Sequence, residues 1–560
     1  MTGVLMPFVP TSALALPQGG NVTAGAATIS TPTGTSLRID QTTDRLIMDW
    51  TRFNIAANES VRFQQPSAAS IALNRVLGPE PSAIFGSLSA NGQIVLMNPS
   101  GILFGAGSRV DVGALTASTL SMRNQDFLAG QYRFTQDPAL ANAAVVNQGV
   151  ITAGPGGYVA LLGAATRNEG VIQAQLGSIA LAAGRAATLD MRGDGLIQFV
   201  VSDAVAGNVI SPDGKPLASY VSNTGTLQAD GGMVILQAKA AGDVIKSVVN
   251  QEGIVRANSL VNHGGVITLI AEGDHATVSN RGILDVSAGE PHATPGGITV
   301  HSDGAISLGG TMTAGAGAIV LAAQDLTLQG AISTSGEMTV NAGNLTIADG
   351  SVRAARGAIT VSGNVTLTGG SVEPGAATIT VGGNWSHQGG SFDPGTSNVV
   401  FNDAGQPSTI LGDNTFYNLT SITPDKSLFF EAGATQTILN NLTLRGERFH
   451  LLHLRSTDPD GIQWRVDPRG SVDIKFVFLG DAFNISPTVI KALPSNSYGN
   501  NTRWDTDPTW NGLGADNDWT TTGNWDTGVA PIATDTVTFD ATSTKNSTVN
   551  AGFAGTIGNL

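Results

Sequence analysis

One short pattern recurs along the chain and limits what it can fold into. Asparagine, any residue, glycine and two strand-forming residues occur at 147–153, 168–174, 223–229 and 280–286, and a variant with one extra residue covers 250–257. Where successive copies are clear they lie about 20 to 30 residues apart, which is a solenoid spacing. Each copy therefore predicts one rung of stacked β-strands, in which asparagines at one corner can form an amide ladder.

A second pattern fills the middle of the chain. Between Gly296 and Gly390 an apolar residue, a threonine and an aliphatic residue recur as a triplet, as in Ile298-Thr299-Val300. Alternation along a strand places the aliphatic side chains inside and threonine outside. This block predicts a regular shaft.

Composition agrees with an all-β chain. The 560 residues include 71 glycines and only 13% charged residues, and no long helical apolar face stands out, so we expect almost no helix. The net charge of −15 argues against a nucleic-acid partner or an anionic membrane surface. The absence of cysteine leaves stacked strands as the source of stability and permits passage through an oxidising periplasm.

The N-terminus predicts a processed leader. Residues 1–15 are mostly apolar and end in Ala13-Leu14-Ala15, a small-x-small cleavage pattern before Leu16. No lysine or arginine precedes Arg38, so we expect the true start to lie upstream or the chain to be trimmed. No later stretch reaches the roughly eighteen apolar residues of a spanning helix. From Gln18 to Ile55, short strands with Trp50 and Phe53 predict a cap over the first rung.

The clearest turn lies between two apolar runs, at Asn98-Pro99-Ser100-Gly101-Ile102. Pro99 lacks an N–H and cannot sit inside a central strand, so it marks a corner. Gly101 can adopt a positive φ, and the Asn98 side chain can bond the following backbone.

This turn belongs to a set of motifs that resembles the secretion domain of the filamentous haemagglutinin family of two-partner secretion. The matching residues, in order, are Phe53-Asn54-Ile55, Val61-Arg62-Phe63, Leu73-Asn74-Arg75-Val76, Asn91-Gly92-Gln93, Asn98 to Ile102, and Ala117 to Leu120. The family's turn is usually Asn-Pro-Asn-Gly-Ile, and Ser100 replaces its third residue. The family's Asn-Pro-Asn-Leu is absent, which indicates the adhesin-like branch. The secretion motif implied by the resemblance comprises Asn74, Arg75, Asn98, Pro99, Ser100, Gly101 and Ile102.

The resemblance implies a fold and an organisation. We expect an all-β, right-handed parallel β-helix of the pectin-lyase-like kind with an N-terminal β cap. Its parts would be a signal-peptide remnant (1–15), a secretion domain (16–271), a shaft (272–456), a loosened boundary segment (457–515) and the start of a further, truncated β-solenoid module (516–560). Either the native polypeptide is expected to continue beyond Leu560, or the gene product is truncated.

The resemblance also implies a function. The chain would be a secreted or surface-exposed adhesin, exported across a Gram-negative outer membrane by a partner β-barrel transporter and binding a host-cell or carbohydrate receptor. No enzyme activity and no cofactor are expected. The alternatives are a polysaccharide-acting β-helix enzyme and the secretion portion of a growth-inhibition toxin.

Few residue patterns support chemistry. Carboxylates occur singly at turns, and His450 and His453 would point to opposite faces of a strand, so neither catalytic nor metal-ligating residues are predicted. Asp516-Asn517-Asp518 more often forms an Asx turn than a Ca²⁺ loop. Arg192-Gly193-Asp194 spells a receptor-binding tripeptide but has the flanks of an ordinary rung corner. Aromatic packing is favoured over a carbohydrate platform for four tryptophans, namely Trp504, Trp510, Trp519 and Trp525.

Overall fold

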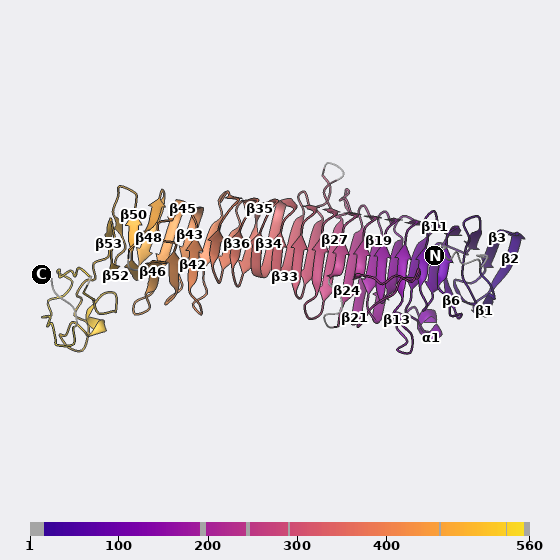
Figure 1. The fold of residues 1–560 in the computed structure, drawn as a ribbon, viewed down its shortest axis with the longest axis horizontal. Coiled ribbons are helices and arrows are strands. Elements are labelled where there is room, and N and C mark those ends of the chain that lie inside the picture. Colours follow the sequence, from indigo (N-terminus) through magenta and orange to yellow (C-terminus); the bar gives the residue numbers. More distant parts are fainter. Residues whose placement is uncertain are drawn as a thin grey trace, which may run out of the picture. The chain divides into compact units, whose positions relative to one another are not determined.

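The computed structural model describes residues 16–190, 198–241, 247–288, 292–458, 461–533 and 535–553. The predicted leader 1–15, Arg192-Gly193-Asp194 and the end of the last predicted module lie outside these ranges. Contacts divide the chain into an N-terminal unit, Met1–Gly304, and a C-terminal unit, Ala305–Leu560 (Figure 1).

The strands of the N-terminal unit are β1 (Asn21–Ala24), β2 (Ala27–Thr33), β3 (Ser36–Gln41), β4 (Arg45–Trp50), β5 (Ser60–Gln64), β6 (Ile71–Val76), β7 (Ser82–Ile84), β8 (Ser87–Ala90), β9 (Gln93–Met97), β10 (Ile102–Phe104), β11 (Arg109–Val112), β12 (Ala114–Ser118), β13 (Tyr132–Thr135), β14 (Ala144–Asn147), β15 (Val150–Ala153), β16 (Tyr158–Gly163), β17 (Ala165–Asn168), β18 (Val171–Gln173), β19 (Ser178–Ala183), β20 (Ala186–Asp190), β21 (Gln198–Asp203), β22 (Ser219–Asn223), β23 (Thr226–Gln228), β24 (Met233–Lys239), β25 (Ser247–Gln251), β26 (Ile254–Arg256), β27 (Val266–Glu272), β28 (Thr277–Asn280), β29 (Ile283–Asp285) and β30 (Gly297–Ser302). Within the described ranges, α1 (Asn124–Leu128) is the one α-helix.

Parallel pairing arranges most of these strands as three walls. Wall 1 contains β4, β6, β9, β12, β16, β19, β24, β27 and β30; wall 2 contains β7, β10, β14, β17, β22, β25 and β28; wall 3 contains β3, β5, β8, β11, β15, β18, β23, β26 and β29. Inward aliphatic residues such as Leu115, Ile151 and Leu236 are fully buried. The all-β parallel helix expected from the sequence is therefore confirmed.

The N-terminal cap is also confirmed. β1 pairs antiparallel with β4, and β2 pairs antiparallel with β3, while β3 and β4 pair parallel with the next rung. Trp50 meets Phe53 edge to face with ring centroids 5.5 Å apart. The cap thus occupies the strand edges that the first rung would otherwise expose.

A buried amide ladder runs along the corner between walls 2 and 3. Asn147 Nδ2 donates to Asn168 Oδ1 (2.8 Å), Asn168 Nδ2 to Asn223 Oδ1 (2.7 Å), and Asn223 Nδ2 to Gln251 Oε1 (2.7 Å). The sequence-based prediction was wrong at one rung, because it aligned Asn250 there with one extra residue. In the structure Gln251 takes the asparagine position, and its longer side chain still reaches the ladder.

Part of the N-terminal unit lies outside the β-helix, which the rung pattern did not predict. β13, β20 and β21 form a three-stranded antiparallel sheet. With α1 it covers wall 1 through an apolar cluster that includes Phe127, Phe134, Leu189, Val95 and Ala160. The outer face of wall 1 is apolar there because a second layer packs on it.

The strands of the C-terminal unit are β31 (Ala305–Leu308), β32 (Thr311–Thr313), β33 (Ala318–Leu328), β34 (Ala331–Ile347), β35 (Ser351–Val361), β36 (Val365–Leu367), β37 (Ser371–Glu373), β38 (Thr378–Val381), β39 (Trp385–His387), β40 (Ser391–Phe392), β41 (Asn398–Phe401), β42 (Ser408–Leu411), β43 (Asn414–Ser421), β44 (Ser427–Phe430), β45 (Thr435–Arg445), β46 (Leu452–Ser456), β47 (Trp464–Pro468), β48 (Ser471–Lys475), β49 (Val477–Gly480), β50 (Ala482–Asn484), β51 (Ile490–Lys491), β52 (Asn496–Gly499) and β53 (Trp504–Asp505), followed by the 3₁₀ helix η1 (Thr522–Asn524).

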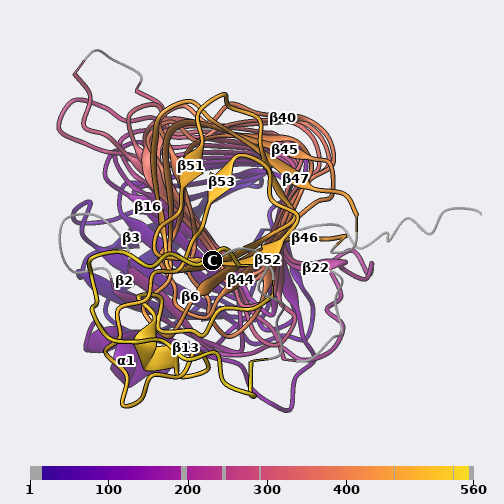
Figure 2. The same cartoon turned by 90° about the vertical axis from the view of Figure 1, so that its left-hand side faces the viewer.

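Rungs of the C-terminal unit superpose when viewed end on (Figure 2). Here an asparagine ladder lies on the outside. Asn344 Oδ1 accepts from Asn364 N (3.0 Å), and Asn364 Oδ1 accepts from Asn384 N (2.9 Å). Inside, Phe430 stacks on Trp464 with centroids 4.0 Å apart.

A small aromatic core organises the last described segment. Trp510, Trp519 and Trp525 are at most 2% exposed and pack with Val537 and Phe553. Parallel bridges join Thr509 to Thr538 and Asp518 to Thr548. None of the helices in the described ranges combines the length and apolar character needed to cross a membrane.

Candidate functional site

Asn98 holds the turn between β9 and β10 with every polar atom of its side chain. Its Nδ2 donates to Glu80 O (2.9 Å) and to Ser82 Oγ (3.0 Å). Its Oδ1 accepts from Ser100 N (2.9 Å), and its own carbonyl accepts from Gly101 N (3.0 Å). The side chain is 0% exposed. In the folded chain Asn98 therefore positions the turn and presents no surface to a partner.

The tip of the turn is the accessible part. Pro99 and Ser100 are half-buried, whereas Gly101 and Ile102 are buried. Gly101 has φ +119°, and a Cβ placed there would lie 3.1 Å from Pro212 Cγ. Ile102 pairs with Ser82 on one side and Val145 on the other. Position 101 thus requires glycine, while position 100 accepts a side chain.

An apolar cavity of about 650 Å³ opens beside this tip. Pro99 and Ser100 line it together with segments 76–81, 140–143 and 210–214. Three of its side chains are well exposed, namely Leu77, Leu140 and Ile210. At its edge, a hydrogen bond from Ser211 lowers the pKa of Asp213. The lining is mostly apolar, as in a contact surface, and its two hydroxyls are those of Ser100 and Ser211.

Asn74 lies in the core, one strand away from the turn. Its Oδ1 accepts from the Trp50 indole Nε1 (2.9 Å), and its Nδ2 donates to Ala72 O (3.3 Å). The side chain is 0% exposed. β6 pairs directly with β9, and this pairing places Asn74 opposite Leu96. The structure therefore brings the two halves of the predicted motif together on adjacent rungs, with both asparagines facing inward.

Arg75 ties wall 1 to the layer outside it. Its guanidinium lies 3.4 Å from Asp49 Oδ1 and donates to Met122 O (3.2 Å) and Asn124 Oδ1 (2.5 Å). Its side chain is 21% exposed. Arg75 is thus a clamp between the cap strand β4 and the segment that leads into α1.

Sequence reasoning did not identify the partners of these residues. Ser82 and the Glu80 carbonyl complete the Asn98 turn, and Trp50 is the group that Asn74 satisfies. The sequence predicts Trp50 only as a residue of the cap core. The sequence contains one signal for the cavity, namely the prolines at 79, 81, 99 and 212. Proline avoids central strands and is found at corners, so these residues mark the turns that line the cavity.

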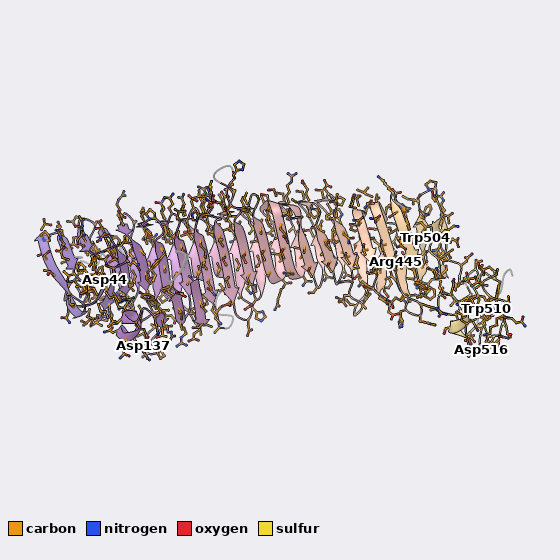
Figure 3. The ribbon with its side chains drawn as sticks, turned by 180° about the vertical axis from the view of Figure 1, so that it is seen from behind. Asp44, Asp137, Arg445, Trp504, Trp510 and Asp516 are labelled. Atoms are coloured by element: carbon orange, nitrogen blue, oxygen red, sulfur yellow. The ribbon has the colours of Figure 1, made fainter. Side chains whose placement is uncertain are left out.

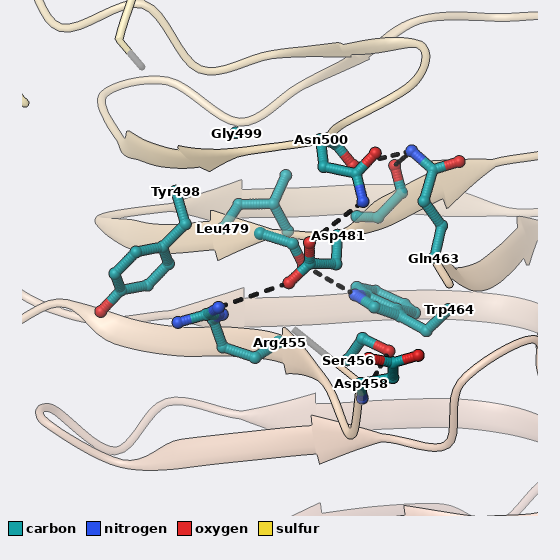
Figure 4. Close-up of polar contacts among 12 residues, drawn as sticks. Arg455, Ser456, Asp458, Gln463, Trp464, Leu479, Asp481, Tyr498, Gly499 and Asn500 are labelled. Atoms are coloured by element: carbon teal, nitrogen blue, oxygen red, sulfur yellow. Dashed lines mark hydrogen bonds and ion pairs between the residues drawn. The ribbon is translucent and has the colours of Figure 1, made fainter. Parts of the chain in front are cut away.

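The polar cluster at the end of the C-terminal unit offers a different arrangement (Figure 4). Asp481 is 4% exposed. Its carboxylate lies 3.5 Å from Arg455 Nη2 and accepts from Asn500 Nδ2 (3.1 Å). Arg455 also lies over the Tyr498 ring, 4.2 Å from its centroid. These two contacts balance the charge of the carboxylate and hold it between neighbouring rungs.

The two neighbouring histidines have separate partners. His450 Nδ1 lies 2.7 Å from Asp425 Oδ2, and His453 Nδ1 lies 2.8 Å from the Tyr498 hydroxyl. Burial lowers the pKa of His453. Over the described ranges no set of three or more His, Cys, Asp or Glu residues is placed to hold a metal.

A lysine from a later stretch of the last segment lies beside the acidic loop 516–518. Lys545 Nζ donates to Gly514 O (2.6 Å) and lies 3.4 Å from Asn524 Oδ1. Asp516 Oδ1 accepts from Asp518 N, which is the Asx turn favoured by the sequence. Figure 3 shows Trp510 and Asp516 in this same segment. The buried tryptophans there form the aromatic packing that the sequence favoured.

Comparisons with known proteins place these features in a family. The family model for the TPS secretion domain matches residues 13–286. The heme/hemopexin-binding protein of Haemophilus influenzae strain ATCC 51907 is 32% identical over 268 residues, which is 47% of this chain and 28% of that protein. A second heme/hemopexin-binding protein from Haemophilus influenzae is 29% identical over 279 residues, 46% of this chain and 28% of its own length.

Two solved structures are also similar. The HMW1 secretion domain from Haemophilus influenzae has a TM-score of 0.41 and 21% identity, covering 88% of this chain and all of that one (100%). A filamentous hemagglutinin secretion domain has a TM-score of 0.27 and 15% identity, covering 68% of this chain and 100% of that one.

The family match lies on the capped helix that contains Asn74, Arg75 and the Asn98 turn. Residues 13–286, which include these features, match the TPS secretion domain, and this match confirms the resemblance to the filamentous haemagglutinin family. The chain spans 28% of the length of the curated relatives it matches.

Proposed function

We propose that this chain is the export-directing part and shaft of a secreted, adhesin-like exoprotein. The observation that carries the proposal is the TPS secretion domain at residues 13–286, with its ordered Asn98 turn. We assign 16–271 to the secretion domain, 272–456 to the shaft, 457–515 to a boundary segment and 516–560 to the start of a further module; the family match extends into the first residues of the shaft, to residue 286.

The partner in this proposal is an outer-membrane β-barrel transporter of the two-partner type. It recognises the secretion domain on the periplasmic side, and the chain then crosses in an extended form. Parallel pairing of each rung with the one before it supports folding that begins at the cap, because every completed strand offers a template to the next. Folding outside the cell then favours exit over return.

The secretion motif acts in this proposal through the turn. Asn98 and Asn74 are buried and hydrogen-bonded, so in the folded chain they position the backbone around Pro99 and Ser100. The transporter could contact either asparagine side chain only before the chain folds, while both are still exposed.

The regular rungs support a display role for the C-terminal unit. The proposal places the protein at the cell surface or in the medium, with a host-cell or carbohydrate receptor and without nucleic acid or a cofactor. It assigns no enzyme activity; in the C-terminal cluster the buried Asp481 carboxylate is paired with Arg455.

Co-expression tests the proposal. The chain, preceded by a cleavable leader, is produced in a Gram-negative host with and without the partner transporter, and the culture medium is assayed by immunoblot. We expect the chain in the medium only with the transporter, and in the periplasm without it. Equal amounts in the medium under both conditions would refute two-partner export.

A further inference from the structure

The outer face of wall 3 carries a row of β-branched side chains, which we call the outer aliphatic stripe. Strand pairing aligns its members one above another: Val150, Val171, Thr226, Ile254 and Ile283. Ile283 is 38% exposed and the other four are half-buried. Outward positions of a solvated sheet are usually polar, so a row of four aliphatic residues and one threonine across five rungs marks a contact surface.

This face differs from wall 1, where outward apolar residues are already covered. There the antiparallel sheet packs through Phe134, Leu189 and Val201. On wall 3, a groove of about 400 Å³ opens beside the stripe, lined by Thr152, Gln173 and Gln228 among others. The groove leaves wall 3 accessible to another molecule.

Charged residues lie on both sides of the stripe. The row one corner before it consists of Gln148, Glu169, Thr224, Glu252 and Arg281, and the row after it consists of Thr152, Gln173, Gln228, Arg256 and Asp285. Arg281 lies 3.8 Å from Glu252, and Arg256 lies 3.8 Å from Asp285. These side chains are 71%, 43%, 41% and 21% exposed, respectively. Both pairs are long, and all four side chains are at least partly exposed, so they can also contact a second molecule.

The two rows complement each other under one symmetry. When two copies face each other about a two-fold axis parallel to the stripe, strand direction reverses and each rung keeps its height. The row before the stripe then faces the row after it on the other copy. Glu252 meets the second copy's Arg256, and Arg281 meets its Asp285. The aliphatic residues meet their own counterparts at the usual sheet-to-sheet distance of about 10 Å.

The other two-fold arrangement is less favourable. An axis along the strands reverses the order of rungs and keeps each row facing itself. Glu169 would then face the second copy's Glu252, and Arg256 would face Gln173. That arrangement brings two symmetry-related like-charged pairs together and forms no opposite pair, so electrostatics selects the parallel one.

We propose that the outer aliphatic stripe docks a second copy of this chain, side by side and in the same direction. Five rungs about 4.8 Å apart give a stripe about 19 Å long, and the charged rows make it about 13 Å wide. The flat area is about 250 Å² per copy, well below the roughly 800 Å² per partner of a stable interface. The association is therefore weak and reversible, and it operates where copies are concentrated.

A charge-complementation experiment tests this proposal on the full chain. Glu252→Arg places two arginine pairs across the dimer, and Arg256→Glu places two glutamate pairs. Each variant alone is expected to shift the concentration of half-association at least tenfold upward in sedimentation velocity. An equimolar mixture is expected to restore association, because opposite charges then meet at both contacts: the introduced arginine faces the introduced glutamate, and the unchanged Arg256 faces the unchanged Glu252. Ile283→Gln is expected to weaken association in any combination.

Arg353→Glu provides the matched control, since Arg353 is an exposed arginine paired with Glu373 outside this surface. It should leave association unchanged. Circular dichroism verifies that each variant keeps its β content. A chain that stays monomeric at every concentration overturns the proposal, and so does a mixture that associates no better than its components. Both readouts are independent of export, so they succeed or fail separately from the secretion function.

Discussion

Two buried tryptophans, one in each unit, are held in the same way. Trp50 Nε1 donates to Asn74 Oδ1 (2.9 Å), and Trp385 Nε1 donates to Asn414 Oδ1 (2.8 Å). Both indoles are 1% exposed, and each asparagine comes from a later stretch of its unit. Since a buried indole N–H needs an acceptor, an inward asparagine is one solution inside this solenoid, whereas the buried Trp464 uses the Gly480 carbonyl. In the folded chain, the hydrogen bond between Asn74 and Trp50 thus has the same structural role as the one between Asn414 and Trp385.

The surroundings of the two asparagines differ between the units. Asn414 Nδ2 continues to Gln436 Oε1 (3.0 Å), so the amide chain stays inside the rungs. Next to Asn74 in the sequence is Arg75, which reaches outward to Asp49 and Asn124. In the secretion domain, Arg75 therefore connects the β-helix to the layer outside it. This connection distinguishes the domain from the plain shaft.

The largest effect is expected from removing the buried asparagines. Asn74→Ala and Asn414→Ala should each lower the free energy of unfolding by about 2–3 kcal/mol, because an indole N–H is left buried without an acceptor. Denaturant titration followed by tryptophan fluorescence measures both. A much smaller loss of unfolding free energy for Asn74→Ala than for Asn414→Ala would show that the two asparagines differ in role, and would favour recognition as the role of Asn74.

A smaller effect is expected from the clamp. Arg75→Ala should cost about 1–2 kcal/mol and raise amide exchange in α1, because the half-buried guanidinium loses hydrogen bonds to Met122 and Asn124. Arg353→Ala is the control in the shaft, where an exposed pair contributes less than about 1 kcal/mol. Unchanged exchange in α1 would contradict the clamp.

Acid should weaken the C-terminal unit through His453. Burial lowers the pKa of this imidazole in the folded chain, so below pH 6.5 the unfolded chain binds its proton first. Its stabilising contribution is complete above pH 6.5 and is lost as the pH falls through the lowered folded pKa. His453→Gln should remove this part of the pH dependence between pH 7 and 5 in denaturant midpoints. An identical pH profile for the variant would refute the assignment.

The smallest effect is expected at the tip of the turn. Ser100→Asn restores the family's usual third residue at a half-buried position whose backbone N–H already bonds Asn98. Stability and export should match the parent chain. A clear gain in export would show that Ser100 weakens recognition by the transporter.

Much of the fold could be predicted from the sequence because rungs repeat a local rule. Val, Ile and Thr alternate along short strands, and glycine or asparagine closes each corner, so the parallel helix and its cap were predictable. The Asn98 turn was predictable for the same reason, since Pro99 and Gly101 restrict the backbone locally.

The remaining features depend on contacts between distant residues. The outer sheet of β13, β20 and β21 forms because apolar residues on wall 1 require cover, which alternation within one strand does not reveal. The substitution of Gln251 for asparagine in the ladder depends on register, and register is set by pairing with the previous rung. The clamp of Arg75 joins residues 49 places apart, to Asn124.

Export of Asn98→Asp tests the central claim most directly. Aspartate keeps the oxygen that accepts from Ser100 N but loses the donor to Glu80 O and Ser82 Oγ. With the partner transporter present, we predict at least a tenfold drop of this variant in the medium, and a partial drop for Ser82→Ala, which removes one acceptor of the same amide. Export of Asn98→Asp at the parental level would contradict the claim that this turn directs secretion.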